Sequence, residues 1–287
     1  PNTKVIAIDR DDTVISSAKI LETKFNKRFK FHRIKFSQID TIFEKHIDTI
    51  IFDLGLSSIQ LKNFNRGFSF NSKDKLDMTM GLSDTSAQEV INTLSEAQLN
   101  LIIKTLGEEK DASKIAKNIV KARSINKITR VDELVKIIKK SKKRNFSYKI
   151  NPCTKTFQAL RIFVNKEITE LVNGIINAAK IVKPGGKILV ITFHSIEDKI
   201  VKYFFRNFSK NKSRPSRYLP TVDYTNHAIF EKYNNRTIKP SKEELKKNNP
   251  SRSAKLRSAI RSKNKFTYPK NFIQKFKKYL EVEAISV

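Results

Sequence analysis

Two acids follow apolar runs at points where a strand would end. Asp9 comes directly after KVIAI, residues 4–8, and Asp53 lies within TIIFDL, residues 49–54. In open α/β sheets, ligands bind in the crevice beyond the carboxyl ends of the strands. A carboxylate there can accept hydrogen bonds from both hydroxyls of a nucleoside ribose, so both acids are candidates for such a site. Each could equally serve only its local backbone, because Asp also caps helices and forms turns before Gly.

Further side chains of the right chemistry follow predicted strands. Gln60 lies near the end of DLGLSSIQL, a stretch whose small residues would let a ligand approach the backbone. Phe36 ends the predicted strand FKFHRIKF and could stack on a flat ring, although a phenylalanine at a strand end is more often a core residue. His194 follows the predicted strand KILVITF and either lines the crevice or caps the helix that begins near Ile196.

Other chemistries are poorly supported. His194 and Ser195 have no legible triad acid and GxSxG is absent, so a hydrolase is not favoured. The four histidines are scattered and the chain has one cysteine, Cys153, which argues against a zinc cluster. We therefore expect no metal site.

Apolar periodicity predicts the elements that position these residues. Strands at 4–8, 29–36 and 49–54 alternate with helical segments, as in a parallel α/β sheet. Residues 85–165 show only helical spacing and include a very basic loop at 139–149. A helix at 166–182, a KPGG turn at 183–186 and a strand at 187–193 then resume the sheet. Residues 209–250 are expected to be a long surface loop, and 253–262 a late strand.

These patterns divide the chain. Residues 1–84 and 166–262 are expected to form an α/β domain, 85–165 an inserted helical domain, and 263–287 a basic tail. The tail contains an amphipathic helix at 270–282, with Phe272, Phe276, Tyr279 and Leu280 on one face. Packing against the body is favoured over contact with a partner.

The charge indicates a polyanionic partner. The 287 residues contain 58 Lys and Arg against 28 Asp and Glu, a formal net charge of +30 spread along the chain. Nucleic acid is the leading candidate, and a lysine- and asparagine-rich genome is the plainer explanation. No apolar run approaches the ~20 residues needed to span a bilayer, and the N-terminus has no signal-peptide pattern. With a single cysteine, these features predict a soluble, cytoplasmic protein.

Seven segments in the expected order carry a family resemblance. They are DLGLSSIQL, RGFSF, LDMTM, GEEKDASKIAKNIVKAR, TKTFQALRIFVN, PGGKILVITFHSIEDKIVKYFF and NPSRSAKLR. Together they closely resemble the bacterial 16S ribosomal RNA cytosine-N4 methyltransferases of the RsmH or MraW type. The resemblance covers residues 4 to 261 and excludes the tail.

The resemblance implies a Rossmann-like S-adenosylmethionine-dependent methyltransferase with an inserted helical domain. By motif, Asp9, Phe36, Asp53 and Gln60 look like cofactor contacts. The first strand and glycine-rich loop of the family are expected to be missing from this chain. The implied partner is 16S rRNA or the small ribosomal subunit, and the oligomeric state, monomer or homodimer, stays open.

The implied reaction transfers a methyl group to the exocyclic N4 of a cytidine in the decoding region. No general base is identified, and Asp53 and His194 are the candidates. The residues that look RNA-facing are Arg161, Asn165, His194, Lys255 and Arg257, although each could make an ordinary salt bridge or lie on a solvated face. The competing hypothesis is a noncatalytic RNA-binding or ribosome-assembly protein, or an inactive fragment of the enzyme. Affinity for S-adenosylmethionine discriminates between the two.

Overall fold

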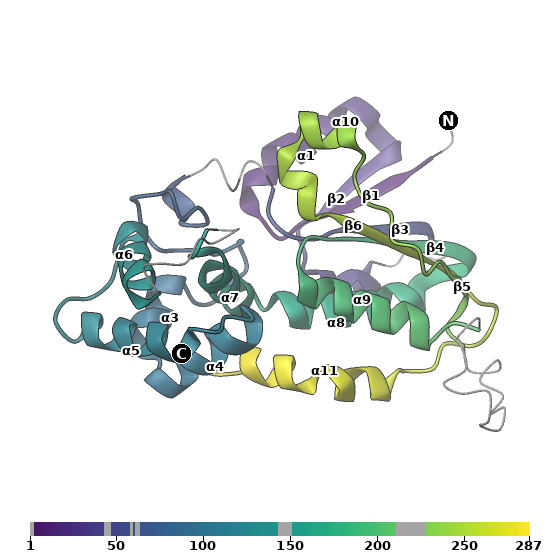
Figure 1. Cartoon of the computed structure of the whole chain (residues 1–287). Coiled ribbons are helices and arrows are strands. Elements are labelled where there is room, and N and C mark those ends of the chain that lie inside the picture. The colour runs from purple at the N-terminus through teal and green to yellow at the C-terminus, as the bar shows by residue number, and fades with distance from the viewer. Residues whose placement is uncertain (1–2, 43–46, 58–59, 61–63, 143–150, 211–227) are drawn as a thin grey trace, which may run out of the picture. The chain divides into compact units, whose positions relative to one another are not determined.

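The computed structural model describes residues 3–42, 47–57, 60, 64–142, 151–210 and 228–287, and it is a mixed α/β structure (Figure 1). The chain divides into two compact units. The first consists of Pro1–Lys35, Leu56–Glu170 and Lys277–Val287, and the second of Phe36–Gly55 and Leu171–Phe276. The predicted boundaries of an α/β domain and a helical insertion stay a prediction.

The first unit begins with a strand, a helix and a strand. β1 (Val5–Ile8) pairs in parallel with β2 (Phe29–His32), and α1 (Ile15–Phe25) connects them. The strand predicted at 4–8 and the helix after it are confirmed. The strand predicted at 29–36 is too long, because the Ile34 amide bonds back to the His32 carbonyl (3.2 Å) and turns the chain out of the sheet.

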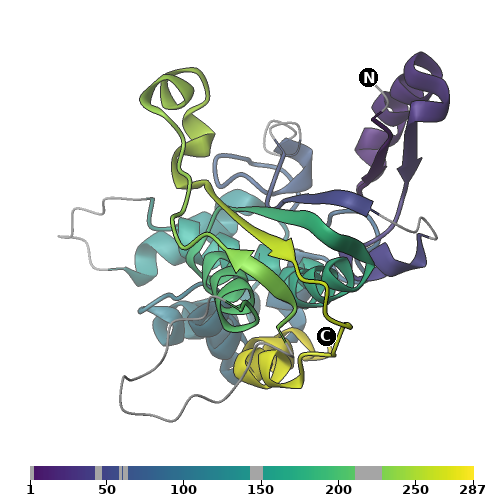
Figure 2. The ribbon, with the colours of Figure 1, turned by 90° about the vertical axis from the view of Figure 1, so that its right-hand side faces the viewer.

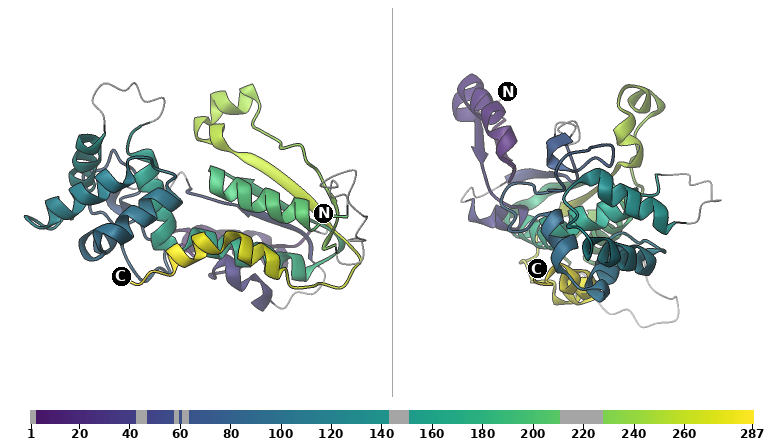
Figure 3. Two further views of the ribbon diagram at one scale, coloured as in Figure 1. Left: turned by 60° about the horizontal axis from the view of Figure 1, so that its bottom comes forward. Right: turned by 90° about the vertical axis from the view of Figure 1, so that its left-hand side faces the viewer.

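Among the described residues of the same unit, five helices lie between residues 87 and 165, where the periodicity predicted helices (Figure 3). Ser86 and Ser95 start the first two through capping boxes with Glu89 and Gln98, which satisfy amides that a helix start leaves unpaired. The apolar faces of these helices are buried to form one core. The helices are α3 (Ala87–Thr93), α4 (Glu96–Leu106), α5 (Ala112–Arg123), α6 (Val131–Ser141) and α7 (Thr154–Asn165). Most of the basic loop predicted at 139–149 lies outside the described residues.

The second unit contains a four-stranded sheet in the order β3-β4-β6-β5 (Figure 2). β3 (Ile47–Asp53) is parallel to β4 (Val182–Thr192), whereas β6 (Lys255–Arg261) runs antiparallel to both β4 and β5 (Phe230–Tyr233). The parallel arrangement expected of the early strands is found in the β1–β2 pair and between β3 and β4, and the late strand predicted at 253–262, for which no direction was predicted, is the antiparallel β6.

Two local predictions are wrong in this unit. The KPGG turn at 183–186 lies inside β4, because Val182 pairs with Ile47 and the extra residues are absorbed by a shift in register before Lys187 pairs with Thr49. Gly185, at φ +79°, permits this irregularity. The loop predicted at 209–250 contains β5 and a short helix, α10 (Lys242–Lys247), while residues 211–227 lie outside the described part.

An aromatic cluster fixes the remaining helices of the second unit. Phe204 of α9 (Ser195–Asn207) packs at a ring-centroid distance of 4.6 Å from Phe272 of α11 (Lys270–Glu283) and 5.4 Å from Phe230 of β5. Phe272 and Phe276 are fully or almost fully buried. The first half of α11 thus packs against its own unit, as the apolar face of the predicted tail helix indicated.

The far end of α11 makes a polar contact within the first unit. Glu283 accepts hydrogen bonds from the backbone amides of Ile168 (2.9 Å) and Thr169 (2.8 Å) at the start of α8 (Glu167–Ile181), and from the Thr169 hydroxyl (2.6 Å). The side chain is buried, and burial raises its pKa to about 8 even though these hydrogen bonds act in the other direction. A residue 114 positions away therefore caps α8.

Candidate active site

Asp9 lies where the sequence placed it, directly after β1. Its amide continues the ladder to the His32 carbonyl (3.3 Å), and its carboxylate accepts the Asp11 amide (2.8 Å). No side chain among the described residues hydrogen-bonds to Asp9. Partial burial, more than the nearby charge of Asp11, raises the pKa of Asp9. A half-buried carboxylate held only by backbone is suited to accept hydroxyl groups of a ligand.

Asp11 is the buried centre of a network beside Asp9. One of its oxygens caps the following 3-10 turn through the Thr13 amide (3.0 Å), and the other accepts from Gln60 Nε2 (2.5 Å) and Arg66 Nη1 (2.7 Å). Burial would raise the pKa of Asp11, but the hydrogen bonds from Gln60, Thr13 and Arg66 outweigh it and hold the pKa below its usual value. Asp11 is therefore an anion that ties two distant segments to the end of β1.

Gln60 is engaged within the chain. Its side-chain oxygen accepts the Ser57 amide (2.9 Å), its own amide donates to the Ser57 hydroxyl (3.1 Å), and it is largely buried. Together with the bond to Asp11, these contacts fix the loop that follows β3. The predicted cofactor role of Gln60 stays untested, and the geometry assigns it a structural link to Asp11.

The segment 78–83 packs against the Asp9 turn in a constrained conformation. Met78 is fully buried at φ +62°, a left-handed conformation that side chains rarely adopt. Gly81, at φ +58°, approaches Arg10 so closely that a Cβ there would lie 2.3 Å from the Arg10 carbonyl oxygen. Arg66 holds the same segment by accepting the Met78 amide (2.8 Å) and donating to the Thr79 carbonyl (2.7 Å).

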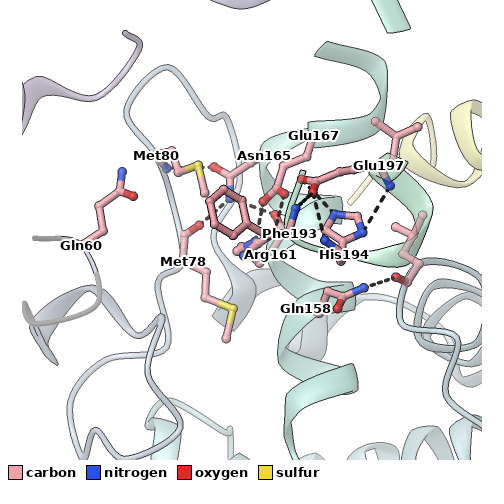
Figure 4. A network of polar contacts seen from close by, with 12 residues as sticks. Gln60, Met78, Met80, Gln158, Arg161, Asn165, Glu167, Phe193, His194 and Glu197 are labelled. Atoms are coloured by element: carbon pink, nitrogen blue, oxygen red, sulfur yellow. Dashed lines mark hydrogen bonds and ion pairs between the residues drawn. The ribbon is translucent and has the colours of Figure 1, made fainter. Parts of the chain in front are cut away.

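Asn165 locks this segment from the end of α7 (Figure 4). Its side-chain oxygen accepts the Met80 amide (2.8 Å) and the Ser83 hydroxyl (2.9 Å), while its side-chain nitrogen donates to the Met78 carbonyl (2.8 Å) and to that of Arg161 (2.9 Å). The amide is buried and uses its full hydrogen-bonding capacity. The prediction that Asn165 contacts RNA stays untested, and its observed contacts are structural.

Arg10 adds further hydrogen bonds to the 78–83 segment and to Asn165. Its guanidinium donates to the Asn165 carbonyl (2.8 Å), the Leu82 carbonyl (3.1 Å) and the Ser83 hydroxyl (2.8 Å). Burial lowers the pKa of Arg10, and the surrounding acids, Glu170 first, act against that shift. The residue next to Asp9 is thus joined to both the 78–83 segment and α7.

In the second unit, Asp53 is the last residue of β3 and lies opposite Ile191 of β4. Its side chain is partly exposed and has no hydrogen bond or ion pair with another described residue. Partial burial and then the negative charge of Glu197 raise the pKa of Asp53. Gly55 follows at φ +98°, where a Cβ would lie 3.2 Å from the Phe193 ring, so the chain passes closely over the end of β4.

His194 is the N-cap of α9, one of the two alternatives that the sequence left open. Its Nδ1 accepts the Glu197 amide (3.5 Å), and Glu197 accepts the amides of Phe193 (2.8 Å) and His194 (3.2 Å) in return (Figure 4). Its Nε2 lies 3.1 Å from the Glu197 carboxylate, an ion-pair distance without hydrogen-bond alignment. Since Nδ1 is used for capping, His194 is a weaker candidate for a general base than Asp53.

Phe36 is not at a strand end, so that part of its prediction is wrong. It opens the 3-10 helix Phe36–Thr41, and its ring meets Phe52 of β3 edge-on at 5.4 Å. Gly174 of α8 makes room for it, because a Cβ there would lie 3.0 Å from the Phe36 Cβ. The ring is half-buried in an apolar contact, and its cofactor role stays untested.

The cations predicted to face RNA have intramolecular partners. Arg161 holds Glu167 through two hydrogen bonds of 2.7 and 2.8 Å. Arg257 is buried and donates to Asp198 (2.7 Å) and the Tyr233 hydroxyl (2.7 Å), and the half-exposed Lys255 donates to Asp198 (3.1 Å). Burial would raise the pKa of Asp198, but these two cations outweigh it and lower that pKa.

The structure thus links Asp9 and Gln60 in one unit, through Asp11, and places Asp53 and His194 at the ends of adjacent strands in the other. Sequence reasoning missed Asp11, Arg66 and Arg10. The repeated acids of DRDD were the available signal, because acids two residues apart after a strand can divide into one that binds and one that holds the turn.

Comparison with known proteins agrees with this architecture. A mixed α/β fold with acids at strand ends is consistent with an α/β methyltransferase. Residues 1–262 match the family model described as the MraW methylase family, and the chain belongs to that family. Among curated relatives, it is similar to "Ribosomal RNA small subunit methyltransferase H" of Bartonella grahamii, with 41% identity over 90% of this chain and 77% of that protein.

Proteins of the same name from other bacteria are equally similar. The Ehrlichia ruminantium (strain Welgevonden) protein is 41% identical over 90% of this chain and 85% of its own length. The Sinorhizobium fredii protein is 40% identical over 90% of this chain and 75% of its own length. No helix among the described residues is both long and apolar enough to cross a membrane.

Proposed function

We propose that this protein methylates the exocyclic N4 of a cytidine in the decoding region of 16S rRNA, with S-adenosylmethionine as methyl donor. The observation that carries the proposal is Asp9, a half-buried carboxylate after a parallel strand, in a chain that matches a methylase family over residues 1–262. The names of the relatives supply the small-subunit ribosomal RNA as the substrate class.

The residues of the first unit fit the nucleoside part of such a donor. Asp9 has no described side-chain partner, so its carboxylate is available to a ribose, whereas Asp11 is saturated by Gln60, Arg66 and Thr13. When bound, the donor supplies an electrophilic methyl group on a sulfonium. Asp9 would bind the ribose of the donor, and Asp11 together with Arg66 fixes the turn that carries Asp9.

Methylation of the cytidine also needs a group that takes up a proton. Transfer of the donor's methyl group to N4 of the cytidine, with the bonding electrons left on sulfur, would require N4 to lose a proton. Asp53 is the candidate for that proton because its pKa is raised and it has no partner among the described residues. His194 instead uses Nδ1 to cap α9 and orients the turn beside it.

The test is transfer of labelled methyl from S-adenosylmethionine to small ribosomal subunits that lack the modification, followed by nucleoside digestion. Label in N4-methylcytidine is expected. Label only in another nucleoside would overturn the proposed acceptor, and no label would overturn the proposal and favour a noncatalytic RNA-binding protein if RNA still binds.

Matched variants assign the roles. Asp53→Asn should reduce transfer strongly, whereas Asp48→Asn, at the start of the same strand, should leave it near normal. Asp9→Asn should raise the dissociation constant of the product S-adenosylhomocysteine, whereas Asp12→Asn, in the 3-10 turn that follows, should not. Equal effects within either pair would remove that acid from the site.

A further inference from the structure

The exposed charged side chains of α5 are all lysines. Lys114, Lys117 and Lys121 recur at spacings of three and four residues, are all exposed, and are preceded by the exposed Lys110 in the turn before the helix. At about 100° per residue, these side chains share one face, and the three in the helix span about 10 Å along it. We call these four residues the lysine stripe.

The opposite face of α5 explains why the stripe points outward. Ala112, Ile115, Ala116 and Ile119 are fully or almost fully buried in the core of the first unit. The hydrophobic pattern therefore orients the helix, but it does not require that every charge on the outer face have the same sign. A mixture of Glu and Lys would be equally compatible with this packing.

The stripe contradicts two local rules of helix stability. Lysines three and four residues apart repel one another, and Lys114 lies in the first helical turn, where the helix dipole favours acids. No acid occurs anywhere in α5. Positions that break local rules without an evident gain in the folded chain are typical of functional surfaces.

Two other helices show the ordinary arrangement. In α6, Lys136 pairs with Asp132 (3.4 Å), and in α11, Lys277 pairs with Glu281 (3.3 Å). Two further lysines of α11 lie over aromatic rings, Lys275 over Tyr203 and Lys278 over Tyr279. The stripe lysines have no such partner among the described residues, so a general excess of lysine does not account for their arrangement.

We propose that the lysine stripe of α5 is a contact surface for the phosphate backbone of the RNA substrate. Phosphates are the anions that compact ammonium groups bind as point charges, and a row about 10 Å long can lie against several consecutive phosphates. This inference rests on the proposed function, because that function supplies the RNA. The contact positions the RNA and does not read its sequence.

The test compares two triple variants with the same loss of charge. One is Lys114→Gln, Lys117→Gln and Lys121→Gln, and the other is the matched change of Lys275, Lys277 and Lys278 to Gln in α11. Binding to unmethylated 16S rRNA is measured across a salt series. The slope of log affinity against log salt falls by about 0.7 for each lost phosphate contact, so the α5 variant should lose about 2 units of slope and at least about tenfold in affinity at low salt.

The α11 variant should keep the wild-type slope to within about half a unit. Equal losses of salt slope and affinity in the two variants, or an α5 variant with unchanged RNA binding, would overturn the proposal that the lysine stripe contacts RNA. The α5 variant should also melt at the same temperature or higher, since like charges are removed, and replacement of the three lysines by Arg should preserve binding. If wild-type protein itself neither binds 16S rRNA nor methylates it, the proposed function fails together with the stripe.

Discussion

Gly81 offers the sharpest test of how the Asp9 turn is positioned. Replacement by Ala places a Cβ 2.3 Å from the Arg10 carbonyl oxygen, so the 78–83 segment or the turn must move by about 1 Å to reach ordinary contact. A left-handed backbone costs a non-glycine residue about 1–2 kcal/mol, and overpacking adds about 1–3 kcal/mol. The expected loss of unfolding free energy is therefore about 2–5 kcal/mol.

Gly185→Ala is the matched control. Gly185 also has a positive φ, +79°, but a Cβ there meets nothing within 4 Å. Its replacement should cost only the backbone penalty of about 1–2 kcal/mol. Urea unfolding measures both losses.

The functional consequence should separate the two variants further. A displacement of about 1 Å near a reacting group can cost about 100-fold in rate, so Gly81→Ala should weaken S-adenosylhomocysteine binding and raise the KM for the methyl donor. Gly185→Ala should leave both unchanged. The reasoning is refuted if Gly81→Ala loses no more stability than the control and keeps the affinity of wild-type protein in calorimetric titration.

Three other perturbations follow from buried polar groups. Asn165→Ala leaves the Met80 amide without its partner and should cost about 2–4 kcal/mol of unfolding free energy. A loss below about 1 kcal/mol in urea unfolding would contradict the structural role of Asn165. Glu283, whose pKa rises from 4.5 unfolded to about 8 folded, contributes stability that is fully present below about pH 4.5 and lost as the pH rises through about 8, by at most about 5 kcal/mol. Glu283→Gln should flatten this pH dependence of the unfolding free energy. If the wild-type protein and the variant lose the same unfolding free energy between pH 5 and pH 9, Glu283 is not the source of the dependence. Arg257→Ala leaves the Asp198 carboxylate and a tyrosine hydroxyl short of a donor and should cost about 3 kcal/mol, to be checked by thermal unfolding against Arg252→Ala on the exposed turn.

The sequence predicted the local elements well where a short-range signal specified them. Apolar periodicity marks α3 and α4, which the structure shows to begin at capping serines, and the apolar run before Asp53 marks β3. His194 before an acid three residues on is compatible with a cap, which the structure contains. The predictions failed where a partner overrode the local signal. KPGG reads as a turn in isolation, yet β3 supplies hydrogen-bond partners that keep Val182 to Lys187 in a strand.

The candidate site divides in the same way. The sequence by itself determined that Asp9 and Asp53 follow strands, because strand ends are local, and that the chain carries a large positive charge. Only the tertiary structure decided that Asp11 is saturated while its neighbour Asp9 is not, since the groups that saturate it come from residues 49 and 55 positions away. Burial and hydrogen bonding by distant segments set the chemistry of each carboxylate, and no pattern within a short window contains that information.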